Sequence, residues 1–132
     1  MNDEPTEILE GGTQIWKNSE GQYHRDHDLP AVVWPSGTSY WYQNGLLHRD
    51  NDLPAIVWPD GRCEWCINGL RHRDNDLPAV IWPDDWCYWY QNDRYIREAQ
   101  RTKEETEQYK KPYYLQKPKK KIKFDRFKKL IK

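Results

Sequence analysis

The chain has 132 residues, enough for one domain and a tail but too few for several domains. Its 21 basic and 21 acidic residues give a formal net charge of zero. Taken alone, that balance argues against binding to nucleic acid or to a membrane surface, because both favour an excess of cations.

The charge is unevenly distributed along the chain. Residues 1–98 carry eight cations and seventeen anions, a net charge of −9, whereas residues 99–132 carry thirteen cations and four anions, a net charge of +9. All eight tryptophans lie in the first segment, which must therefore supply the core. The sequence predicts an acidic folded domain over residues 1–97 and a basic arm over residues 98–132.

The N-terminus does not look like a targeting segment. Its first ten residues are acidic and contain Pro5, unlike the basic start and apolar run of a secretion signal. We therefore expect a protein that is not secreted and has no transmembrane segment. Three cysteines in such a chain indicate unpaired thiols rather than a disulfide framework.

A 24-residue repeat organises the first segment. His-Arg-Asp begins at residues 24, 48 and 72, and Leu-Pro-Ala, Trp-Pro and a further Trp follow in step. The expected units are residues 5–24, 25–48, 49–72 and 73–97, and this repetition indicates a stacked array. The residues taken as structural markers of the repeat are His24, Asp26, His48, Asp50, His72, Asp74, Trp41, Trp65 and Trp89.

Each unit has the pattern of a β-hairpin. Residues 31–34 form a short run of β-branched and aromatic side chains, and residues 35–37 have the composition of a turn. Over residues 38–43 the character of the side chains alternates with a period of two, as in a strand. Asn44-Gly45 then supplies the pair that a tight turn with positive φ prefers. The predicted fold is all-β: a single-layer antiparallel sheet of about four stacked hairpins, with eight strands spanning roughly 38 Å.

Comparison of the units predicts which side chains are buried. The small residues Ser39, Cys63 and Cys87 alternate with the repeated tryptophans, so we expect this face to form the core. The opposite positions vary and should present an aromatic surface, which either binds a partner or is covered by the arm. Its expected members are Tyr40, Tyr42, Trp86, Tyr88 and Tyr90.

Motifs that resemble catalytic or metal-binding sites are better explained as structural. His-Arg-Asp occurs in protein kinases, but the glycine-rich loop and the other kinase motifs are missing. Histidines one unit apart lie roughly 9.6 Å from each other, too far to share one zinc ion. We expect each histidine to bond a loop carboxylate or carbonyl and each arginine to pair with an aspartate. No enzyme activity, metal or cofactor is expected.

The spacing of the cysteines does not indicate a redox or zinc site either. Cys63 and Cys66 have the separation of a redox or zinc motif, but residues three apart on a strand point to opposite faces. We expect Cys63 and Cys87 to be buried and Cys66 to be an exposed thiol.

The last 35 residues are basic and amphipathic. Helix formers over residues 98–111 predict a short helix that ends at Pro112. On a helix, the apolar residues of the segment 119–132 fall on one side. This pattern favours a protein groove as partner over nucleic-acid phosphates, with anionic lipid or a solvated tail as further alternatives. The expected contact residues are Lys119, Lys120, Lys121, Phe124, Phe127, Lys128, Lys129 and Leu130.

The unit from Trp41 to Gly61, W-x-x-N-G-x-x-H-R-D-x-D-L-P-A-x-x-W-x-D-G, resembles the MORN-like hairpin repeats of giant DNA viruses of amoebae, the marseillevirus group especially. The resemblance covers about Pro5 to Arg97. It implies an elongated antiparallel sheet used as a scaffold, and a virion or capsid-associated protein located in the virion or the host-cell cytoplasm. The alternatives are a nucleic-acid-associated protein that uses the same arm and a host-interaction scaffold.

Overall fold

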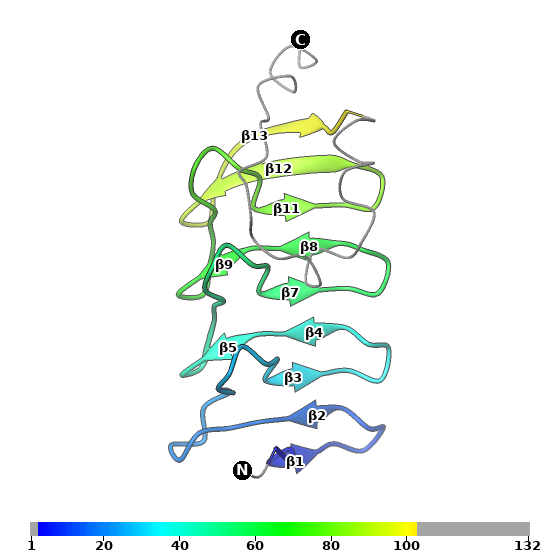
Figure 1. Ribbon diagram of the computed structural model, residues 1–132, viewed down its shortest axis with the longest axis vertical. Coiled ribbons are helices and arrows are strands. Elements are labelled where there is room, and N and C mark those ends of the chain that lie inside the picture. Colours follow the sequence, from blue (N-terminus) through cyan, green and yellow to red (C-terminus); the bar gives the residue numbers. More distant parts are fainter. Residues whose placement is uncertain (1–2, 103–132) are drawn as a thin grey trace.

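The computed structural model describes residues 3–102, which form an all-β fold built on an antiparallel sheet of nine strands (Figure 1). The strands follow the order β1-β2-β3-β4-β7-β8-β11-β12-β13. They are β1 (Glu7–Ile8), β2 (Gln14–Ile15), β3 (Val32–Val33), β4 (Ser39–Tyr40), β7 (Ile56–Val57), β8 (Cys63–Glu64), β11 (Val80–Ile81), β12 (Trp86–Gln91) and β13 (Arg94–Gln100). The predicted all-β fold with antiparallel hairpins is confirmed.

Two small hairpins lie beside the main sheet. β5 (Tyr42–Gln43) pairs with β6 (Leu46–Leu47), and β9 (Cys66–Ile67) pairs with β10 (Leu70–Arg71). The Asn-Gly pairs predicted as turns connect these strands, with φ of 49° at Asn44 and 50° at Asn68. Positive φ at both turn positions matches the twist of the flanking strands, as tight hairpins require.

The chain turns a corner at each repeated tryptophan. The single strand expected over residues 38–43 is broken at Trp41 into β4 and β5. Trp41 N donates to the carbonyl of Ala55 in the following unit (2.7 Å), whereas Trp41 O accepts from His48 N in its own hairpin (3.0 Å). Each tryptophan thus bonds both the following unit and the small hairpin of its own unit. The structure therefore has a nine-stranded sheet flanked by two hairpins, in place of the expected single-layer sheet of eight strands.

Cross-strand pairs define two faces of the main sheet, since directly opposed residues share a face. The inner face carries Ile8, Gln14, Val33, Ser39, Val57, Cys63, Ile81, Cys87 and Ala99 in successive strands. The outer face carries Glu7, Ile15, Val32, Tyr40, Ile56, Glu64, Val80, Tyr88 and Glu98.

The core lies on the inner face, where the repeated tryptophans pack. From Val57 to Ala99 the inner-face side chains are at most 4% exposed. Toward the other end, Ser39 is partly exposed and Ile8 is 61% exposed. The inner face is therefore closed near β13 and open near β1.

The sheet continues beyond the boundary expected at residue 97. β13 runs to Gln100, and Arg101 N donates to the carbonyl of Asp85 (2.7 Å). The first three residues of the expected helix, 98–100, are thus in a strand. Residues 103–132, which include all of the arm's expected contact residues, lie outside the described residues.

Candidate protein-binding surfaces

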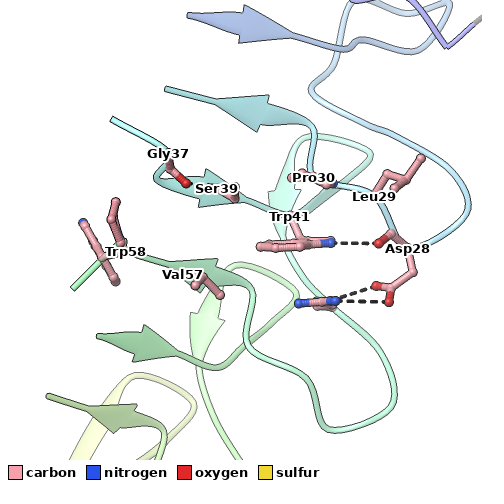
Figure 2. Close-up of a pocket in the computed structure, with 10 residues that line it drawn as sticks. Asp28, Leu29, Pro30, Gly37, Ser39, Trp41, Val57 and Trp58 are labelled. Atoms are coloured by element: carbon pink, nitrogen blue, oxygen red, sulfur yellow. Dashed lines mark hydrogen bonds and ion pairs between the residues drawn. The ribbon is translucent and has the colours of Figure 1, made fainter. Parts of the chain in front are cut away.

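Each tryptophan corner is held by a clamp of three side chains. In the clamp around Trp41, the indole Nε1 donates to the carbonyl of Asp28 (3.1 Å), and the Arg49 guanidinium lies 3.9 Å from the ring centroid. Arg49 also donates to both carboxylate oxygens of Asp28 (2.8 and 3.2 Å) and to the carbonyl of Pro54 (3.1 Å). One buried arginine therefore joins a ring, a carboxylate and a loop carbonyl. Figure 2 shows the bonds that Asp28 makes in this clamp.

The clamp recurs along the array with the same partners. Its tryptophan always donates to an aspartate 13 residues earlier, and its arginine stacks 3.7–3.9 Å from the ring centroid. The four clamps are Asp3–Trp16–Arg25, Asp28–Trp41–Arg49, Asp52–Trp65–Arg73 and Asp76–Trp89–Arg97. Since Arg25, Arg49 and Arg73 belong to the unit that follows the unit of their tryptophan, these three clamps tie neighbouring units together.

The repeated histidines hold the loops. His48 Nδ1 accepts from the backbone N–H of Asn68 (3.1 Å), so Nε2 carries the hydrogen that bonds Asp50 (2.8 Å). His24 and His72 make the same contacts. The loop aspartates thus bond histidine and arginine side chains, which gives their repetition a structural role.

Aromatic side chains form a continuous strip on the outer face. Tyr40 contacts Trp34 and Trp58 edge-on, with centroid separations of 6.1 and 6.4 Å. Arg62 lies between Trp58 and Trp82, 4.2 and 3.8 Å from their ring centroids. We call Trp34, Tyr40, Trp58, Arg62 and Trp82 the aromatic strip. Sequence reasoning missed its three tryptophans, although the repeated Trp-Pro pairs were the signal.

The aromatic residues expected to project together lie in two groups. Tyr40 and Tyr42 are neighbours, at 6.4 Å between centroids, and Tyr90 packs on Tyr95 at 5.8 Å. Trp86 and Tyr88 are on β12, four strands away from Tyr40 in the sheet order. On the outer face, Glu64 on β8 lies between the two groups.

All three cysteines are buried, and none of them forms a disulfide. Cys63 and Cys87 lie in the core as expected, but the expectation of an exposed Cys66 is wrong, because this residue is 3% exposed. The break at Trp65 moves β9 out of the main sheet and places Cys66 in the core cluster. Burial raises the pKa of both Cys63 and Cys66 to about 12.

We expect the protein to lose stability as the pH rises above about 9. Unfolded thiols deprotonate near the ordinary cysteine pKa of 9.0, whereas the folded Cys63 and Cys66 keep their protons up to about 12. Each thiol can contribute at most about 1.4 kcal/mol per pH unit across this window. Denaturant unfolding between pH 8 and about 10.5 should show a smaller fall for Cys63→Ala/Cys66→Ala than for the native chain. Equal slopes would contradict the assignment.

A cavity of about 330 Å³ opens on the inner face between β4 and β7 (Figure 2). Ser39 and Val57 line its floor, Trp58 stands on the side of the turns, and Leu29 and Trp41 stand on the side of the loops. The Asp28–Arg49 pair closes one corner. The cavity is mainly apolar and lies where the inner face begins to open.

Within residues 3–102, no group of three or more His, Cys, Asp or Glu side chains is arranged to hold a metal ion. The same residues include no helix that is long and apolar enough to cross a membrane. Comparisons of the chain with models of protein families, with curated proteins and with solved structures found no match.

Proposed function

We propose that the chain is a non-catalytic scaffold that binds another protein. In this proposal it is a solenoid of about four stacked 24-residue hairpin units, followed by a short helical, basic arm that anchors it to a partner. The likeness of its unit to the MORN-like repeats of giant DNA viruses makes a capsid or other virion component the favoured partner.

The aromatic strip is the observation that carries this proposal. Tryptophan, tyrosine and arginine are the residues most enriched at the centres of protein interfaces. Trp34, a member of the strip, is 40% exposed. The clamps hold successive units in a defined relation, so the surface is organised before a partner binds, which lowers the entropic cost of association.

Affinity capture with two matched variants tests the strip. Trp34→Ser/Trp58→Ser removes two rings of the aromatic strip, whereas Ile8→Ser/Leu9→Ser removes two exposed apolar side chains at the β1 end. We expect the native chain and the Ile8/Leu9 variant to recover the same partner and the tryptophan variant to lose it. Recovery of that partner by all three proteins would contradict the strip as the binding surface. Detection of the chain in purified particles would support the virion assignment, and its absence would remove it.

The basic arm also supports a second candidate, binding to nucleic-acid phosphates. Filter binding of the full chain to DNA over a range of salt concentrations separates the two, because neutralised phosphates make affinity fall steeply with salt. A steep fall would support this second function, and absence of binding at low salt would remove it. Recovery of host rather than virion proteins would favour the host-interaction scaffold.

A further inference from the structure

The inner face is an apolar trough between two acidic edges. On the loop side, Asp28, Asp52 and Asp76 keep about half of their side-chain surface exposed, at 48%, 44% and 54%. On the side of the turns, exposed carboxylates stand at Glu10, Asp60 and Asp84. Between these edges the floor is built from small and aliphatic side chains. The trough therefore suits an apolar segment flanked by positive charges.

Burial along the trough increases toward the end where the described chain leaves the sheet. Leu29 is 36% exposed, whereas Leu77, its equivalent two units later, is 2% exposed. The cavity beside Leu29 lies at the more exposed end of the trough (Figure 2). A large exposed apolar patch on a small protein usually marks a site that another chain segment, partner or ligand covers.

The remaining chain has the composition that such an occupant requires. Residues 103–132 carry twelve cations and four anions, a net charge of +8, against −8 for residues 3–102, which carry nine cations and seventeen anions. Cations recur at every third position from residue 117 to residue 132. Phe124, Phe127 and Leu130 each directly follow one of these cations.

The three-residue interval also matches the trough. In the polyproline II conformation, which has three residues per turn, residues three apart lie on the same side of the chain and roughly 9 Å from each other. Successive units are separated by two strands, or roughly 9.6 Å. From Thr102 to Phe124 the chain can extend about 70 Å, and the cavity lies four strands, roughly 19 Å, from β13. The arm is therefore long enough and has the correct spacing.

We propose that residues 117–132 dock in an extended, polyproline II conformation along the inner face of their own chain, with Phe124, Phe127 and Leu130 filling the open end of the trough. The neighbouring cations Lys123, Arg126 and Lys129 then lie against the acidic edges. This contact is made in the isolated chain and does not depend on the scaffold function. A partner that binds the arm has to compete with the trough for it.

A single introduced thiol reports on this contact in the full chain. Ser39 lines the cavity and occupies the position that Cys63 and Cys87 hold in later units. Its hydroxyl donates to the carbonyl of Gly37 (3.3 Å), as the Cys63 thiol does to Gly61 (3.5 Å), so Ser39→Cys keeps the local bonding. Because the native thiols are buried, they react slowly while the domain is folded, and this controls for unfolding.

The rate of Ser39→Cys labelling is compared in three proteins. The first has the native arm, the second carries Phe124→Ser/Phe127→Ser/Leu130→Ser, and the matched control carries Tyr113→Ser/Tyr114→Ser/Leu115→Ser. We expect labelling to be at least about tenfold slower with the native arm and with the control than with the second protein, as for a site that opens only when the arm leaves.

Three outcomes would overturn the proposal. Equal rates in all three proteins would show that the arm does not cover the trough. Faster labelling of the control would assign the contact to other residues of the arm. Protection that grows with protein concentration would place the arm of a second copy in the trough. Protection that weakens as salt is raised supports the role of the acidic edges.

Discussion

Replacement of Trp65 by alanine is expected to destabilise the domain by about 3–5 kcal/mol, the usual cost of deleting a buried aromatic ring. The Trp65 ring is 3% exposed and belongs to the core cluster. Its indole N–H bonds the carbonyl of Asp52 at 3.0 Å, and Arg73 stacks 3.9 Å from the ring centroid. Small domains are stable by only about 5–15 kcal/mol, so this single loss removes a large share of the stability.

Denaturant unfolding, followed by circular dichroism, measures this effect. Trp34→Ala is the matched control, because its ring is 40% exposed and should cost about 1 kcal/mol or less. Trp65→Phe keeps an aromatic ring but leaves the Asp52 carbonyl without its donor, so we expect a loss of about 1–2 kcal/mol. Equal losses for Trp65→Ala and Trp34→Ala would contradict the central role of the tryptophan corner.

Replacement of Arg49 by alanine is expected to cost about 3 kcal/mol, because it leaves a carboxylate and a buried carbonyl without their donors. The Arg49 side chain is 6% exposed, but that of Asp28 is 48% exposed, so water screens part of the loss. Lysine should recover little of it. A single ammonium cannot bond both carboxylate oxygens and the Pro54 carbonyl while also stacking on Trp41.

The control for this prediction is Arg94→Ala, an exposed residue of β13 whose loss should change the free energy of unfolding by about 0.5 kcal/mol or less. Arg49→Met distinguishes the ionic and packing contributions, because it fills the site without charge. A higher unfolding midpoint for Arg49→Met than for the native chain would show that the ion pair does not stabilise the corner.

Local sequence patterns were sufficient to predict the hairpins. β-Branched and aromatic runs, Asn-Gly pairs and the alternation of small residues with tryptophan depend on neighbours within one unit. These features predicted the antiparallel sheet, the turns at Asn44 and Asn68 and the burial of Cys63 and Cys87.

The tryptophan corner could not be predicted in this way, because it depends on the next unit. Alternation over residues 38–43 fits a single strand, and the break at Trp41 arises from its bond to Ala55. Cys66 was misplaced for the same reason. The clamps did leave a signal, the constant 13-residue interval between aspartate and tryptophan, which holds even at Asp3 and Trp16 outside the His-Arg-Asp triplets.

The way in which the clamps straddle unit boundaries makes the length of the protein adjustable. Removal of residues 49–72 would bring Arg73 to the place of Arg49 beside Asp28, where Arg73 could still bond the Pro78 carbonyl. Every remaining tryptophan corner would therefore keep its full set of partners. Each gain or loss of a unit changes the length of the sheet by roughly 9.6 Å. Duplication or loss of units during evolution can therefore change the length of this protein in regular steps.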